Sequence, residues 1–212
     1  MSGIDTTRKC NFVVFSQHLF FVDKKLSTVE TENMTTPLRV LGIDPGSRVT
    51  GFGILEERGQ TVVYLDSGTI DVSRLPLFTD RLHKIYEEIQ KIVSKHQPKE
   101  AAIEAPFVQK NVQSALKLGK TVGAITLALL SQKISVVEYA PRLVKQSIVG
   151  YGNAEKEQVQ FMIASLVGAP RDSSLDAMDA LAVAWCHLQQ IRIKNMLTGS
   201  SRDFTPYRES SQ

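Results

Sequence analysis

The stretch Leu38-Arg-Val-Leu-Gly-Ile-Asp-Pro-Gly-Ser47 decides how this chain folds, because an apolar run passes directly into a turn. Residues 38–43 predict a short buried strand, and Pro45-Gly46 marks the turn that ends it. Asp44 follows the apolar run, so the strand behind it would hold its carboxylate at the end of a sheet. The same residue could serve the turn alone, because Asp is common before Pro-Gly in turns.

Two further strands are expected directly after this turn. Residues 49–55 alternate in polarity and carry Gly51 and Gly53, as expected for a strand in close contact with another element. Residues 61–72 have the pattern of a third strand. Together with the strand at 38–43, these segments predict an antiparallel meander.

The rest of the pattern alternates between helices and strands. Apolar residues at three- and four-residue steps predict an amphipathic helix over 75–96. We expect Asn153 to cap one of the later helices. The segments after 96 predict, in order, a strand, a helix, a strand and three helices, at 100–103, 112–130, 135–139, 142–149, 155–167 and 174–193. This order predicts an α/β fold with a five-stranded mixed sheet flanked by helices.

Composition narrows the class of protein. With 212 residues, 42% hydrophobic and 22% charged, the chain is sized for one globular domain. Its longest apolar run, 125–130, is too short to span a bilayer, so no membrane role is expected. A net charge of +3 is compatible with a nucleic-acid partner but does not establish one. Cys10 and Cys186 are isolated, which argues against a disulfide framework and favours a reducing, cytoplasmic location.

The predicted domain occupies residues 37–193. Residues 1–36 hold an apolar patch that Gln17 and His18 interrupt, and no signal-peptide cleavage pattern follows it. We expect this segment to be a disordered extension or the product of a mis-assigned start. Residues 194–212 are rich in Ser, Arg and Thr without an apolar period, which predicts a disordered tail.

Three more acids stand in unusual contexts. Glu104 ends the short apolar strand at 100–103, where burial of a carboxylate is costly unless it is paired or bound to a cation. The strand could instead emerge into solvent at this point. Asp176 and Asp179 are three residues apart in a small, apolar helical segment, so they share one face. They could also be placed only to complement the helix dipole.

The acids make chemical sense as one site formed by Asp44, Glu104, Asp176 and Asp179. Clustered carboxylates repel one another and therefore need a cation. All-oxygen ligands suit Mg²⁺ or Mn²⁺. Two such ions about 3.5–4 Å apart can activate a water and stabilise the leaving oxygen of a phosphodiester. The pattern predicts a metal-dependent phosphodiester hydrolase.

Several segments resemble the RuvC family of crossover junction endodeoxyribonucleases. They are Gly42–Gly51, Ala102–Glu104 with Phe107 and Lys110-Asn111, Ser114–Gly119, Val144–Gln146, Val149–Lys156 and Asp176–Ala182. The resemblance covers roughly residues 38–187 and implies an RNase H-like fold, in agreement with the predicted order of elements. It implies that the four acids are catalytic and bind Mg²⁺, with two ions per site and Mn²⁺ as a substitute.

The same resemblance implies a substrate and partners. A homodimer would resolve Holliday junctions in DNA recombination and repair by nicking two strands of like polarity. A branch-migration complex like RuvAB is a candidate partner.

The resemblance also assigns residues that contact DNA. It implies that Phe107 wedges into the open junction centre, where stacking on a base contributes about 1–3 kcal/mol. Composition alone would favour a core role for this residue. Lys145 and Lys156 would hold the backbone near the scissile phosphate. Further phosphate contacts, which would make binding salt-dependent, are expected from Lys110, Lys117 and Lys120.

Two other functions compete with this interpretation. An actin-like or sugar-kinase ATPase also begins with an Ile-Asp-x-Gly strand and turn. Such proteins need two domains and a second phosphate loop, whereas this chain is short and has no Asp-Gly-Gly-type loop after Ser135. A non-catalytic junction-binding protein of the same fold is the second alternative, and the retention of all four acids argues against it.

Overall fold

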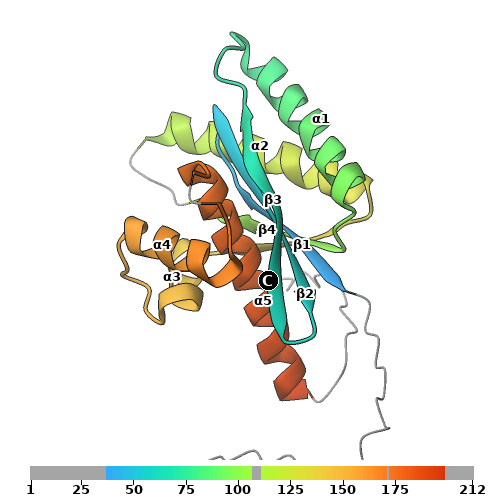
Figure 1. Cartoon of the computed structure of the whole chain (residues 1–212). Coiled ribbons are helices and arrows are strands. Elements are labelled where there is room, and N and C mark those ends of the chain that lie inside the picture. The colour runs from blue at the N-terminus through green and yellow to red at the C-terminus, as the bar shows by residue number, and fades with distance from the viewer. Residues whose placement is uncertain (1–36, 107–110, 171, 199–212) are drawn as a thin grey trace, which may run out of the picture. The chain divides into compact units, whose positions relative to one another are not determined.

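A computed structural model describes residues 37–106, 111–170 and 172–198 (Figure 1). The expectations for residues 1–36 and 199–212, and those for Phe107 and Lys110, lie outside this part of the chain. The elements are β1 (Leu38–Asp44), β2 (Val49–Arg58), β3 (Thr61–Asp71), α1 (Phe78–His96), β4 (Glu100–Glu104), α2 (Val112–Ser131), β5 (Ser135–Tyr139), α3 (Pro141–Val149), α4 (Lys156–Val167) and α5 (Leu175–Thr198).

The strands form one mixed sheet in the order β3-β2-β1-β4-β5. β1, β2 and β3 pair in antiparallel fashion, which confirms the predicted meander. β4 runs parallel to β1, and β5 runs parallel to β4. The central strand β1 therefore pairs through Ile43 with Phe52 on one side and with Ile103 on the other.

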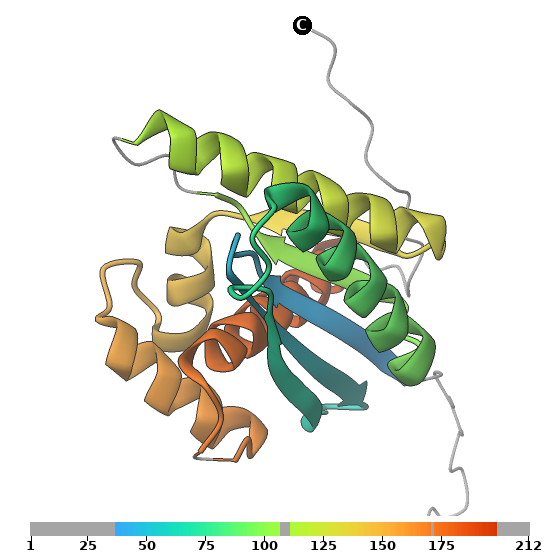
Figure 2. The ribbon, with the colours of Figure 1, turned by 90° about the horizontal axis from the view of Figure 1, so that it is seen from above.

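Helices cover both faces of the sheet. Figure 2 shows α1 and α2 on one face and α5, with α3 and α4 beside it, on the other. The alternation along β1 serves both layers, because Val40 packs in the core under α5 whereas Leu41 and Ile43 pack under α1 and α2. No helix within the described ranges is both long and apolar enough to cross a membrane.

Glycines allow α5 to lie directly on the sheet. A β-carbon added to Gly42 would lie 2.1 Å from the carbonyl oxygen of Ala180, and one added to Gly51 would lie 2.0 Å from that of Asp176. At Gly53 it would lie 2.7 Å from the side chain of Leu181. The prediction that Gly51 and Gly53 mark a close contact is confirmed, and that contact is with α5.

Three expected helix ends were wrong, and the first is the start of α1, which begins at Phe78 rather than at 75. α4 begins after Glu155, which makes no side-chain capping bond, so the expected N-cap Asn153 lies outside the helix. The carbonyl oxygen of Ala154 accepts a hydrogen bond from Lys145 of α3 rather than one within α4. α5 continues to Thr198 rather than ending at 193, so the expected tail begins too early.

Candidate active site

The ends of two neighbouring strands place the first two acids. Asp44 is the last residue of β1 and Glu104 is the last residue of β4. Because Ile43 pairs with Ile103 in the parallel register, the two acids follow side by side. The side-chain alternation of a strand directs both toward the face that α5 covers. Their side chains lie within hydrogen-bonding reach of each other.

The start of α5 brings the other two acids to the same place. The backbone of Asp176 lies against Gly51, and Gly51 is the partner of Asp44 in the β1–β2 ladder. Asp179 follows three residues later on the same side of the helix. The structure therefore brings together the acid cluster, which we define as Asp44, Glu104, Asp176 and Asp179.

The negative charges of the acid cluster are not fully neutralised by the lysines near it. Burial, and then the charges of Glu104, Asp179 and Asp176, raise the pKa of Asp44 to about 8 against the opposing effect of Lys156. The pKa of Glu104 is also raised, first by burial and then by Asp179. Carboxyl groups that resist ionisation in this way mark a site where an additional cation would be strongly stabilised.

Two lysines and a glutamine surround the acids. Lys156 Nζ lies 2.5 Å from Asp179 Oδ2, and the Nε2 amide of Gln160 donates to Asp179 Oδ1 at 3.0 Å. Lys145 Nζ donates to the carbonyl oxygen of Ala154 at 2.8 Å, and its charge partly offsets the burial and the Asp179 charge that raise the pKa of Glu104. Gln160 was not among the residues predicted from the sequence, although its spacing of four from Lys156 places both on one side of α4.

The other predicted DNA contacts lie elsewhere or outside the described residues. Lys117 and Lys120 are exposed on α2, which covers the face of the sheet opposite to α5. The structure therefore does not bring them to the acid cluster. Phe107 and Lys110 belong to the segment between β4 and α2 that is not described.

The donor chemistry of the acid cluster suits a hard divalent cation, since every side chain in it offers carboxylate oxygens. Within residues 37–106, 111–170 and 172–198, however, no three His, Cys, Asp or Glu side chains have the geometry that a metal ion requires. Lys156 and Gln160 engage both carboxylate oxygens of Asp179. The residues fit Mg²⁺ or Mn²⁺ in chemical type.

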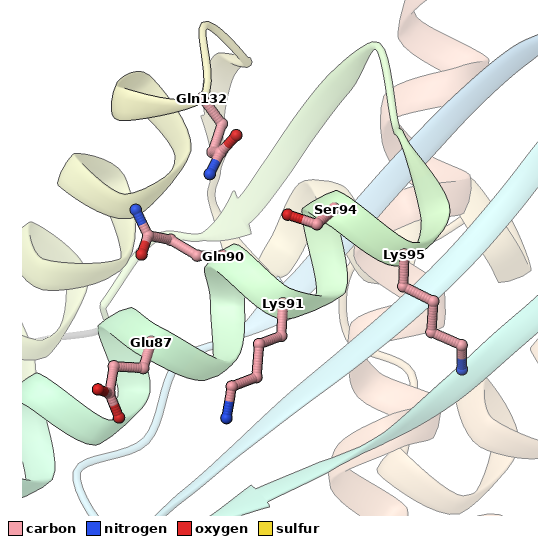
Figure 3. Close-up of a pocket in the computed structure, with 6 residues that line it drawn as sticks. All are labelled: Glu87, Gln90, Lys91, Ser94, Lys95 and Gln132. Atoms are coloured by element: carbon pink, nitrogen blue, oxygen red, sulfur yellow. The ribbon is translucent and has the colours of Figure 1, made fainter.

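A separate hollow of about 680 Å³ lies between α1 and the end of α2 (Figure 3). It is lined by Glu87, Gln90, Lys91, Ser94, Lys95 and Gln132. None of these residues belongs to the acid cluster. The hollow is therefore not part of the candidate active site.

Comparison with known proteins gives a family for the chain. The sequence profile described as "Crossover junction endodeoxyribonuclease RuvC" matches residues 40–187. A protein of that name from Geobacter sulfurreducens is 48% identical over 160 residues, covering 76% of this chain and 98% of the relative. One from Geobacter metallireducens is 46% identical over the same shares of both chains.

Solved structures agree with this result. The RuvC of T. thermophilus in complex with a Holliday junction substrate matches with a TM-score of 0.68 and 30% identity, over 74% of this chain and 96% of that one. The yeast mitochondrial Holliday junction resolvase Ydc2 matches with a TM-score of 0.53 over 76% of this chain and 86% of its own. At 12% identity, Ydc2 supports the fold alone.

The expected RNase H-like fold, with its five-stranded mixed sheet between helices, is confirmed by these neighbours and by the observed topology. Nucleases of the matched family generally depend on a divalent metal, in keeping with an all-carboxylate cluster at the ends of β1 and β4. The chain belongs to the RuvC family of crossover junction endodeoxyribonucleases.

Proposed function

We propose that this chain resolves Holliday junctions in DNA recombination and repair by metal-dependent nicking of two strands of like polarity. The observation that carries the proposal is the acid cluster, in which burial and like charges raise the pKa of Asp44 to about 8. Asp44, Glu104, Asp176 and Asp179 would hold two Mg²⁺ ions, for which Mn²⁺ could substitute. Family membership supports the choice of a four-way DNA junction as substrate.

The protein's own residues would position the metal ions and neutralise the DNA backbone. When bound, the metal ions supply Lewis-acid charge and an activated water for phosphodiester hydrolysis. Asp44 and Glu104 are fixed by hydrogen-bonded strands, so their oxygens would face the ions from a rigid base. Lys145 and Lys156, which lie near the acids on α3 and α4, would hold the DNA backbone beside the scissile phosphate.

Residues farther from the acids would hold the rest of the junction. Phe107 would stack against a base at the open centre, a contact that contributes about 1–3 kcal/mol. Lys110, Lys117 and Lys120 would contact phosphates, and Lys117 and Lys120 are exposed as that role requires. Such contacts release counterions, so junction affinity would fall as salt rises.

An exposed apolar stripe on α2 supports a homodimer. Val112, Leu116, Leu127 and Leu130 are 53–68% exposed. Residues 112 and 130 are 18 positions apart, which is five helical turns, so the stripe keeps to one side of α2. Gly119 and Gly123 lie along the same stripe, and apart from the adjoining backbone of α2 no described atom lies within 4 Å of a β-carbon built on either.

A continuous apolar stripe of this kind marks an interaction surface. Paired α2 helices would bury it, and the two-fold dimer would present two active sites to a two-fold junction. A branch-migration complex like RuvAB would be a further partner, and the cytoplasm is the expected location.

A cleavage assay tests the proposed function. Dimer isolated by gel filtration should nick a mobile four-way junction in Mg²⁺ and leave a linear duplex of the same sequence intact. Asp44→Asn should reduce the rate by about 10²- to 10³-fold or more, the loss typical of removing one electrostatic partner of a transition state. Its affinity for the junction should be largely unchanged.

Two results would contradict the proposal. Absence of Mg²⁺-dependent junction cleavage by the unmodified chain would refute the activity. Cleavage by Asp44→Asn at a near-unmodified rate would refute the assignment of the site.

A further inference from the structure

α4 engages Asp179 through both of its carboxylate oxygens. Gln160 Nε2 donates to Oδ1 at 3.0 Å, and Lys156 Nζ lies 2.5 Å from Oδ2. The Asp179 side chain is only 18% exposed, so its carboxylate is largely shielded from water. A hydrogen bond on one oxygen and an ion pair on the other together fix the plane of the carboxylate.

The two contacts belong to the face by which α4 packs onto the molecule. Lys156 and Gln160 are four residues apart, and Ile163 and Val167 follow at helical spacing on the same side. Ile163 and Val167 are buried in the core that α4 shares with α5. The burial of Ile163 and Val167 fixes this side of α4, and so holds Gln160 against Asp179.

The contacts have different chemical natures. The Gln160 amide is neutral, so a cation bound to the other oxygen of Asp179 would not be repelled by it. The Lys156 ammonium carries a full charge and occupies the oxygen that a metal ion would need. One contact is compatible with a bound metal and the other competes with it.

We propose that Gln160 is a positioning residue that orients Asp179 for metal binding, and that Lys156 is a resident counter-ion that the metal displaces. This inference rests on the proposed function of the acid cluster as a metal site. Displacement frees the Lys156 ammonium, which is half exposed, to approach a DNA phosphate. Metal binding thereby prepares the site for the DNA backbone.

The test measures Mn²⁺ affinity by electron paramagnetic resonance at one fixed pH, without DNA. Gln160→Met, close in shape but without a donor, should bind Mn²⁺ about 10-fold more weakly, as is typical when a group that orients a metal ligand is lost. Lys156→Met should bind Mn²⁺ about 2- to 5-fold more tightly, because the metal no longer has to break the ion pair with Asp179. This fold-change corresponds to the free energy of a part-exposed ion pair.

A matched control lies on the same helix. Gln158 also makes a side-chain hydrogen bond, accepting from the Tyr151 hydroxyl at 2.9 Å, but that bond is exposed and involves no residue of the acid cluster. Gln158→Met should leave Mn²⁺ affinity unchanged. Unchanged affinity in Gln160→Met, or weaker binding in Lys156→Met, would overturn the proposal.

A double-mutant cycle guards against a general effect on folding. If Gln160 acts through Asp179, Gln160→Met should change Mn²⁺ affinity by less than about 2-fold in an Asp179→Asn background. Losses that add in the double variant would refute a positioning role, even if Gln160→Met lowers the melting temperature.

Failure of this inference is distinguishable from failure of the proposed function. Asp44→Asn should weaken Mn²⁺ binding whatever the role of α4. If it does not, the acid cluster is not the metal site. If it does while Gln160→Met has no effect, the metal site stands and the role of Gln160 is refuted.

Discussion

The two ends of the central sheet both bury carboxylates, but they treat the charge differently. At the end where β1 starts, Glu56 is held by Arg39 at 2.7 Å and by Arg58 at 2.6 Å, and Glu57 is held by Arg192 at 2.6 Å. At the opposite end, the charges of Glu104, Asp179 and Asp176 lie close enough to Asp44 to raise its pKa, and Asp179 raises that of Glu104.

Opposite pKa shifts follow from this difference. Burial tends to raise the pKa of Glu56, but the hydrogen bonds and charges of Arg39 and Arg58 outweigh it and lower that pKa. Burial and like charges act in the same direction at Asp44 and raise its pKa to about 8. A carboxylate whose cation belongs to the fold is structural, whereas a cluster without enough cations is built to receive one.

α5 connects the two ends. Its first turns carry Asp176 and Asp179, and its later turns carry His187 and Arg192. His187 is almost fully buried, with Nδ1 2.8 Å from the hydroxyl of Tyr139 and Nε2 2.8 Å from Oε2 of Glu100. These contacts tie α5 to β4 and β5, and so help to hold the two acids on its first turns in place.

The largest loss of unfolding free energy is expected at the end of the sheet where arginines neutralise Glu56 and Glu57. Glu56→Gln removes the anion that two arginines share, and should lower the free energy of unfolding by about 1–3 kcal/mol, since the arginines are partly exposed. Urea denaturation measures this loss. The matched surface change Glu87→Gln, at an exposed ion pair with Lys84, should cost less than about 0.5 kcal/mol. Equal stability of the two variants would show that the arginines do not stabilise Glu56.

The same kind of change should have the opposite sign at the acid cluster. Asp44→Asn removes a charge that its neighbours repel, so the metal-free protein should gain at least about 1 kcal/mol of unfolding free energy at pH 8. Urea denaturation in the presence of a chelator measures the gain. A loss like that of Glu56→Gln would mean that Asp44 is compensated after all, and the contrast between the two ends would fail.

The raised pKa of Asp44 also predicts a pH dependence of stability. The pKa of Asp44 is raised from an ordinary value of 3.8 to about 8 in the folded protein. Between pH 4 and pH 8, Asp44 is therefore protonated in the folded, metal-free protein and ionised in the unfolded chain. The melting temperature of the metal-free protein should therefore fall as pH rises from 4 to 8, by about 2–4 °C for each kcal/mol lost. The lowered pKa of Glu56 acts the other way, and its stabilisation is lost as pH falls below about 4.5.

Asp44→Asn and saturating Mg²⁺ should each flatten the slope between pH 4 and pH 8. The melting temperature is measured by circular dichroism at matched ionic strength. A slope that persists unchanged in Asp44→Asn would assign the dependence to another group.

Much of the fold, and the strand ends that carry two of the four predicted acids, follow from local patterns in the sequence. The apolar run before Asp44 and the short strand before Glu104 indicated strand ends, and both acids are the last residues of their strands. Gly51 and Gly53 indicated a close contact. These features were predictable because strand alternation, turn residues and glycines at close backbone contacts all leave a signal within a few residues.

The partners of the acids could not be predicted in the same way. Gln160 contacts Asp179 across 19 positions, and Arg192 contacts Glu57 across 135. His187 reaches Glu100 across 87 positions. Each of these residues is ordinary in its own segment, and its role exists only once α4 and α5 are packed.

The sequence by itself determined the elements, their order and the strand ends and helix turn that carry the four acids, because hydrogen bonding and apolar periodicity are local. Only the tertiary structure decided which carboxylates are neutralised. Charges interact through distance in space, and the packing of α5 and α4 sets those distances. It gives Glu56 and Glu57 arginines of their own, and leaves Asp44 and Glu104 with raised pKa values beside Lys156.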